Sequence, residues 1–161
     1  MSLERFHEAQ ASRWADYDTA LAEIRAGGKR SHWIWYIFPQ IEGLGRSSTA
    51  RAYAIQDLSE ACAYLRDPTL RAHYEEIVAA VSEHLARGIR IEDLMGGSTD
   101  ALKLVSSLTL FRAAASQLRR EDPVYASLVE RLSALLEQTS EQGYPACEFT
   151  LARIDNSAPA N

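Results

Sequence analysis

The ten residues Ser31-His32-Trp33-Ile34-Trp35-Tyr36-Ile37-Phe38-Pro39-Gln40 form the segment on which the fold depends. They hold two of the three tryptophans of the chain and an unbroken run of large apolar or aromatic residues, Trp33–Phe38. Exposing such a run would leave a large apolar patch, so we expect it in the core. His32 and Gln40 flank the run, and we therefore expect their polar groups at the edge of the core, where they serve either structure or function.

The conformation of this run is ambiguous, because its residues favour a strand. Pro39 also disfavours a helical backbone at the preceding residue, Phe38. Helix signals dominate the rest of the chain. We therefore predict an all-α fold of about six to eight helices in one domain, with at most one short extended segment near Trp33–Phe38.

Capping signals mark where several of these helices begin. Asp57 followed by Glu60 has the form of a capping box. Asp67-Pro68 and Asp122-Pro123 each pair a capping residue with a proline at the first helical position. The apolar spacing over 3–24 fits one helix or two, with residue 16 capping the second, and the glycine pair 27–28 ends it. Further helices are expected through 66 and over about 69–87, 91–95, 99–118 and 124–138.

The composition is that of a folded globular protein. The 161 residues are 47% hydrophobic and 24% charged, which fits one domain over residues 1–155 and a frayed C-terminal tail over 156–161. A net charge of -5 disfavours nucleic acid and anionic membranes as partners. The longest apolar run is too short for a bilayer, and the N-terminus lacks the pattern of a signal peptide. These features, with Cys62 and Cys147 expected as buried thiols, predict a cytoplasmic protein.

The segment from Thr99 to Leu118 is expected to be a buried helix that carries polar residues, because apolar groups lie nearly all round it. Asp100 and Lys103 are three residues apart, a spacing that lets them pair. One interpretation is a structural Lys–Asp pair, with Ser106 and Ser107 bonding back to helix carbonyls. The other is that these four residues form the polar wall of a pocket.

Gly43-Leu44-Gly45-Arg46-Ser47-Ser48 follows the aromatic run and also allows two interpretations. Its backbone N–H groups and hydroxyls suit a phosphate. A glycine turn with a serine N-cap explains the same residues. The segment is neither a dinucleotide fingerprint nor a Walker loop, because the required glycines and lysine are missing.

The histidines offer little catalytic signal in the sequence. His7, His73 and His84 lie among charged residues, so we expect them on solvated helix faces. His32 is the one histidine that we consider as an acid or base, and a core histidine bonded to backbone is the alternative. No grouping has zinc-ligand spacing, and no metal or cofactor is expected.

Five segments together resemble the bacterial domain-of-unknown-function family 1810. The similarity runs from about residue 3 to residue 154. The segments are Arg5-Phe6 with Ala9-Gln10, Ser31 to Gln40, Gly43-Leu44-Gly45, Tyr64-Leu65-Arg66-Asp67-Pro68, and Asp100 to Phe111. The resemblance implies a predominantly α-helical fold and no particular activity. Some relatives carry a calpastatin-like label, which we reject because such inhibitors are disordered and polar, whereas this chain has a core-forming composition.

Two functional hypotheses follow from these observations. The first is a pocket for a small polar or anionic ligand, with a nucleotide-derived ligand as one candidate and catalysis left open. Its candidate catalytic residues are His32, Asp100 and Lys103. Its candidate ligand-binding residues are Trp33, Trp35, Gln40, Gly43, Gly45, Ser47, Ser106 and Ser107. The second hypothesis is a non-catalytic interaction module or homo-oligomer, with an exposed apolar face over Leu3–Ile24.

Overall fold

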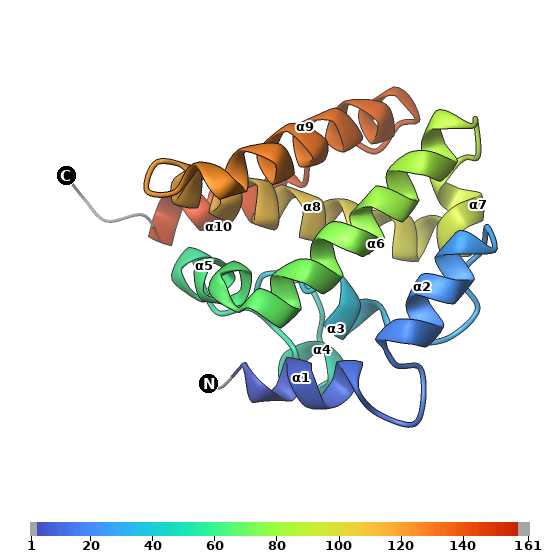
Figure 1. Ribbon diagram of the computed structural model, residues 1–161, viewed down its shortest axis with the longest axis horizontal. Helices are drawn as coiled ribbons and strands as arrows, with labels where there is room; N and C mark the ends of the chain where they lie inside the picture. Colours follow the sequence, from blue (N-terminus) through green and yellow to red (C-terminus); the bar gives the residue numbers. More distant parts are fainter. Residues whose placement is uncertain (1–2, 158–161) are drawn as a thin grey trace.

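The fold is built around one long helix, α8 (Ser98–Arg119), in a computed structural model that describes residues 3–157. Figure 1 shows α8 running through the middle of the molecule, with α9 beside it and α6 crossing it. The other helices are α1 (Glu4–Gln10), α2 (Tyr17–Arg25), α3 (Ile34–Ile37), α4 (Ser48–Ala52), α5 (Leu58–Arg66), α6 (Pro68–Ala86), α7 (Ile91–Met95), α9 (Ala126–Glu141) and α10 (Glu148–Ser157). A 3-10 turn, Pro123–Tyr125, precedes α9.

The all-α prediction is confirmed, because residues 3–157 contain ten α-helices and no strand. The expected number of helices, about six to eight, is too low. Part of the difference comes from α10, whose 10 residues are not expected to be helical from the sequence, and the rest comes from two single-turn helices: α3 has 4 residues and α4 has 5. Segments this short show no full period of apolar residues. Helices this short are unstable alone, so packing against the rest of the molecule stabilises them, and α4 is also capped by Ser47.

The short extended segment allowed near Trp33–Phe38 is not found. Ile34–Ile37 instead form the helical turn α3, and the backbone leaves the helical conformation at Phe38, before Pro39. Trp33, Ile34, Ile37 and Phe38 are all buried. Burial on several sides outweighs the strand preference of these residues, as is common for local propensities. The extended backbone begins later, where Ile41 forms an isolated parallel bridge with Ile55.

Capping residues begin several helices where the sequence predicts them. Asp16 caps α2 by accepting a hydrogen bond of 2.8 Å from the backbone N–H of Thr19. The N-terminal apolar segment is therefore two helices. Asp67 likewise accepts bonds of 3.1 Å from the N–H groups of Thr69 and Leu70 at the start of α6.

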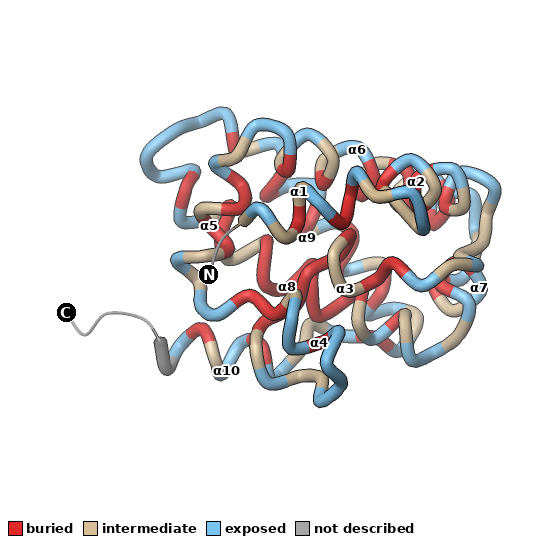
Figure 2. The backbone as a smooth tube through the Cα atoms, turned by 90° about the horizontal axis from the view of Figure 1, so that it is seen from below, coloured by how far each residue is buried: buried red, intermediate tan, exposed pale blue. Residues whose placement is uncertain are grey.

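An aromatic cluster fills the centre of the core. The ring centroids of Tyr74 and Phe111 are 4.6 Å apart, and those of Tyr64 and Phe111 are 5.1 Å apart. Figure 2 shows the buried residues gathered around α8 and α3, with exposed residues on the outer turns. No helix in residues 3–157 is long and apolar enough to cross a bilayer. In the predicted tail, α10 extends to Ser157, and residues 158–161 lie outside the described part.

Candidate functional site

The three candidate catalytic residues, His32, Asp100 and Lys103, line one pocket of about 300 Å³. We call it the lysine pocket. It lies where the segment before α3, the start of α4 and the start of α8 meet. Its lining residues are Lys29, His32, Ile34, Trp35, Ser47, Thr49, Asp100 and Lys103. The indole-rich tract and the polar start of α8 therefore enclose a common space, although they are far apart in the sequence.

Two lysines share one carboxylate in this pocket. Lys29 Nζ lies 2.7 Å from Asp100 Oδ2, and Lys103 Nζ lies 3.4 Å from Asp100 Oδ1. Burial raises the pKa of Asp100, but the hydrogen bond and charge of Lys29 and the charge of Lys103 outweigh it, so the pKa is lower than usual. Asp100 is thus a carboxylate at neutral pH. The trio carries one positive charge in excess.

The two lysines differ in their surroundings. The Lys29 side chain is 6% exposed, and its ammonium also donates to the carbonyl of Ser31 at 2.7 Å. It lies 4.9 Å from the ring centroid of Trp33. The Lys103 side chain is 27% exposed, and its ammonium lies 4.6 Å from the centroid of Trp35. Lys29 is therefore the structural partner of Asp100, whereas Lys103 is the accessible cation.

Lys29 reaches Asp100 because its segment docks on the junction between α7 and α8. The backbone N–H of Lys29 donates to the carbonyl of Leu94 at 2.8 Å. Gly96 permits this approach, because a Cβ atom there would lie 3.1 Å from the carbonyl oxygen of Lys29. Gly96 also has a φ of +78°, which favours glycine. The glycine before α8 thus places Lys29 at the first turn of α8.

Glu23 of α2 fixes the segment between Lys29 and α3. Its carboxylate accepts hydrogen bonds of 2.8 and 2.9 Å from the backbone N–H groups of Arg30 and Ser31. It also accepts a bond of 2.9 Å from Trp33 Nε1, and the Ser31 hydroxyl donates to it as well. Burial raises the pKa of Glu23, but these hydrogen bonds outweigh it and lower the pKa to about 2. A single carboxylate therefore organises the lysine side of the pocket.

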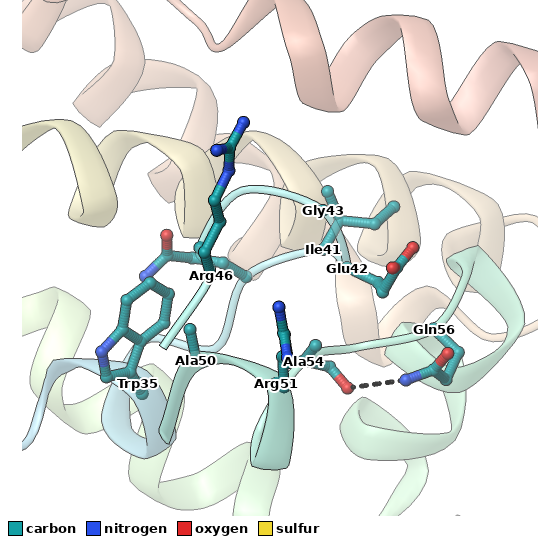
Figure 3. Close-up of a pocket in the computed structure, with 11 residues that line it drawn as sticks. Trp35, Ile41, Glu42, Gly43, Arg46, Ala50, Arg51, Ala54 and Gln56 are labelled. Atoms are coloured by element: carbon teal, nitrogen blue, oxygen red, sulfur yellow. Dashed lines mark hydrogen bonds between the residues drawn. The ribbon is translucent and has the colours of Figure 1, made fainter. Parts of the chain in front are cut away.

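A second hollow, of about 390 Å³, also has Trp35 in its lining. We call it the loop pocket, and Figure 3 shows it between the loop after Gln40 and helix α4. Its lining residues are Trp35, Gln40, Ile41, Glu42, Gly43, Gly45, Arg46, Ala50, Arg51, Ala54 and Gln56. The candidate ligand-binding residues Trp35, Gln40, Gly43 and Gly45 therefore meet here, and Trp35 is common to both hollows.

Three of the other candidate ligand-binding residues, Trp33, Ser106 and Ser107, have contacts outside these two hollows. Trp33 is fully buried and donates to Glu23. The Ser106 hydroxyl donates to the carbonyl of Leu102 at 3.0 Å, one helical turn back. The Ser107 hydroxyl lies 3.0 Å from the hydroxyl of Tyr74 in the core. Neither serine lines the lysine pocket or the loop pocket.

The segment 43–48 contains a glycine turn and a serine N-cap, which are the features that the structural one of its two interpretations requires. Ser47 Oγ accepts a hydrogen bond of 3.1 Å from the N–H of Ala50 and so caps α4. Gly43 has a φ of +104°. At Gly45 the reason for glycine is space, because a Cβ atom would lie 2.5 Å from Cβ of Ala50 and 2.7 Å from the ring of Trp35. The segment thus packs closely on Trp35.

The expectation that three histidines lie on solvated helix faces is wrong for His84 and for His73. His84 is buried, and its Nε2 lies 3.2 Å from the carbonyl oxygen of Arg25. His73 stacks on Tyr17 with a centroid distance of 3.8 Å. Exposed His32, in contrast, is the histidine beside the lysine pocket. In the described part of the chain, no group of three or more His, Cys, Asp or Glu residues is arranged to hold a metal ion.

Sequence reasoning missed Lys29 and Glu23. Neither residue belongs to a recognisable sequence motif, because their contacts depend on a loop that docks on a distant helix junction. One signal was present for Lys29, however. Lys29 and Lys103 are the only lysines among the 17 lysine and arginine residues of the chain, and both contact Asp100. A chain that otherwise uses arginine places both of its compact ammonium charges at one carboxylate.

Comparison with known proteins gives the chain a family. A family model described as protein of unknown function, DUF1810, matches residues 1–139. The chain belongs to this family. The conserved hypothetical protein Rv1873 from Mycobacterium tuberculosis, which has a crystal structure, is 36% identical in sequence to this chain. The match has a TM-score of 0.78 and covers 95% of this chain and 96% of that chain. No curated protein matches. All residues that line the two pockets lie inside the DUF1810 match.

Proposed function

We propose that the lysine pocket binds a small anionic ligand. The observation that carries this proposal is the sharing of Asp100 by two ammonium groups, which gives the lysine and aspartate side chains that line the pocket an excess of one positive charge. Concave sites with a few convergent polar groups are the usual form of small-molecule sites. A negatively charged group restores charge balance there, and Lys103 is the ammonium that can reach it.

The surroundings of Lys103 favour a ligand that joins an anionic group to a planar one. Trp35 provides an aromatic wall shared with Lys103, and Ile34 adds apolar surface. His32 and the hydroxyls of Ser47 and Thr49 provide further polar contacts around the same space. A nucleotide-derived ligand has this combination of an aromatic ring and a phosphate. Lys29 and Asp100 hold the pocket in shape and do not themselves need to contact the ligand.

The proposal is one of binding and includes no reaction. Asp100 is held ionised by both lysines, so it is a poor source of protons at neutral pH. The interaction module remains the alternative class. Within the described part of Leu3–Ile24, Trp14 is the one large apolar side chain that is exposed. One such residue is much less than the buried core of a stable interface needs, so the ligand pocket is the better supported hypothesis.

The scarcity of lysine allows a direct test. A chain labelled with ¹³C at the lysine Cε position should give two side-chain signals, from Lys29 and Lys103. Titration with adenosine monophosphate should shift the Lys103 signal saturably, and calorimetry should give a dissociation constant. Lys103→Met should weaken binding by about tenfold or more, as expected for loss of a charged contact.

Arg120→Met is the matched control, because it removes one positive charge from an exposed residue far from the pocket. It should leave the dissociation constant unchanged, which separates a local contact from an effect of net charge. Inorganic phosphate and acetate extend the panel to anions without a ring. If none of these anions shifts the Lys103 signal, or if Lys103→Met binds as tightly as the unaltered chain, the proposal is wrong.

A further inference from the structure

Two histidine side chains line a third hollow, which lies between α1 and the start of α6 and has a volume of about 390 Å³. We call it the histidine pocket. Helix α1 contributes Glu4, His7, Glu8 and Gln10 to its lining, and α6 contributes Thr69 and His73. Among the described residues, it shares no lining residue with the lysine pocket or the loop pocket.

The side chain of Gln10 determines which nitrogen of His73 carries the hydrogen. Gln10 Nε2 donates to the carbonyl of Tyr36 at 2.8 Å and to the hydroxyl of Tyr64 at 3.0 Å, so Gln10 Oε1 is an acceptor. His73 Nδ1 lies 2.7 Å from this oxygen and therefore donates to it. Burial lowers the pKa of His73 and outweighs nearby carboxylates, so the ring is neutral at pH 7. In this neutral ring the other nitrogen, Nε2, has a lone pair.

Asp67 orients the ring of His7 in the same manner. His7 Nε2 lies 2.7 Å from Asp67 Oδ2. Burial raises the pKa of Asp67, but the hydrogen bond from the N–H of Leu70 and the contact with His7 outweigh it, so the pKa is lower than usual. Because an ionised carboxylate only accepts, His7 Nε2 carries the hydrogen, and Nδ1 of the neutral ring has the lone pair.

Both lone-pair nitrogens are open to a ligand. His7 Nδ1 and His73 Nε2 have no hydrogen-bond partner within residues 3–157, and neither atom is enclosed by the protein. The His73 ring stacks on Tyr17 with 7° between the planes, which fixes its position. The His7 side chain is 30% exposed. The pocket therefore presents two oriented hydrogen-bond acceptors.

The charges around the histidine pocket are negative. Glu4 and Glu8 lie one turn apart on α1 and both line it, whereas no lysine or arginine in the described part of the chain does. Asp67, behind the ring of His7, adds a third carboxylate. A ligand that donates hydrogen bonds and carries positive charge is complementary to this arrangement.

We propose that the histidine pocket binds an organic cation, in which an amidinium, guanidinium or ammonium group is attached to a small apolar body. The N–H groups of this cation donate to His7 Nδ1 and His73 Nε2, and such charge-assisted bonds are stronger than neutral ones. Exposed Glu8 balances the charge. Ala11 and the imidazole faces provide apolar surface for the rest of the ligand. This ligand is opposite in charge to the one proposed for the lysine pocket.

The test follows the imidazoles directly, with benzamidine as the probe. The full chain with histidine labelled with ¹³C at Cε1 should give four signals, from His7, His32, His73 and His84. During titration at pH 8, with sodium chloride balancing the ionic strength, the signals of His7 and His73 should shift saturably, whereas those of His32 and His84 should not. Benzamide, a neutral molecule of similar shape, should bind at least about tenfold more weakly, and benzoate should not shift these signals.

Two variants each remove one acceptor. His73→Phe keeps a flat ring against Tyr17, and in His7→Leu water can replace the imidazole at Asp67, whose side chain is 23% exposed. Each should raise the dissociation constant of benzamidine by at least about tenfold. Circular dichroism shows whether each variant folds. If His73→Phe does not fold, because Gln10 Oε1 has lost its donor, His7→Leu alone decides.

The charge of the pocket is tested separately. Glu8→Gln should weaken benzamidine binding by about twofold to fivefold, as expected for an exposed charge. Glu130→Gln removes an exposed carboxylate from α9 and should leave the dissociation constant unchanged. The inference is overturned if benzamidine gives no saturable shift of His7 and His73, or if benzoate or benzamide binds as tightly. It is equally overturned if a folded variant lacking either imidazole binds benzamidine as tightly as the unaltered chain.

Discussion

Replacing Glu23 with glutamine should destabilise the protein without changing the shape of the site. The glutamine retains an oxygen for the N–H groups of Arg30, Ser31 and Trp33, and its amide faces the Ser31 hydroxyl, so mainly the negative charge is lost. Lowering the pKa from 4.5 to about 2 corresponds to at most about 3 kcal/mol. Because Glu23 is partly exposed, solvent screening reduces this to about 1–2 kcal/mol at pH 7.

Because the pKa of Glu23 is lowered in the folded state, the stability lost in Glu23→Gln depends on pH. A carboxyl group with a lower pKa in the folded than in the unfolded state stabilises the fold at pH values above its unfolded pKa. This contribution is lost as the pH falls through the folded value. For Glu23 the window runs from about pH 4.5 down to about pH 2. The difference in stability between the unaltered chain and Glu23→Gln should therefore be largest at neutral pH and shrink towards pH 3.

Urea unfolding followed by circular dichroism at pH 7, 5, 4 and 3 measures this difference. Glu130→Gln makes the same charge change at an exposed residue of α9 and should cost little at any of these pH values. The reasoning is refuted if Glu23→Gln is as stable as the unaltered chain at pH 7. A loss of stability that stays constant from pH 7 to pH 3 refutes it too, because the charge would then not be the cause.

Two further predictions concern packing. Gly45→Ala should cost about 1–3 kcal/mol, because its new methyl group would lie 2.5 Å from Cβ of Ala50. Gly28→Ala, with its nearest neighbouring atom at 4.0 Å, is the control and should cost less in the same denaturation assay. Tyr74→Phe should cost about 1–2 kcal/mol, because the buried Ser107 hydroxyl loses its partner at 3.0 Å. The double variant with Tyr74→Phe and Ser107→Ala should lose less stability than the sum of the losses in the two single variants. Additive losses would show that the hydrogen bond contributes little.

The positions of many helices are readable from the sequence because local chemistry decides them. Asp67 and Asp122 each precede a proline and cap the helical turn that follows, as the sequence predicts. Asp57 accepts from the N–H of Glu60, while the Glu60 carboxylate accepts from the N–H of Gln56. These contacts lie within four residues, so they need no knowledge of the rest of the fold.

The run Trp33–Phe38 and the residues that complete the site are not predictable in this way. Strand-favouring residues form the turn α3 because the surrounding helices bury them from several sides. The contact of Lys29 with Asp100 depends on a loop docking against Leu94. Spacing within the sequence shows that Lys103 can reach Asp100, but it does not show that Lys29 also contacts this carboxylate, at the shorter distance of 2.7 Å.

The scarcity of lysine has a consequence for reagents and enzymes that modify amines. Among the side chains of this chain, only Lys29 and Lys103 carry a primary amine. The first is 6% exposed and engaged by Asp100, so Lys103, at 27%, is the amine that an acetyl donor can approach. Acylation of side-chain amines would therefore be directed to a single position. It would cancel the positive charge that makes the lysine pocket attractive to anions.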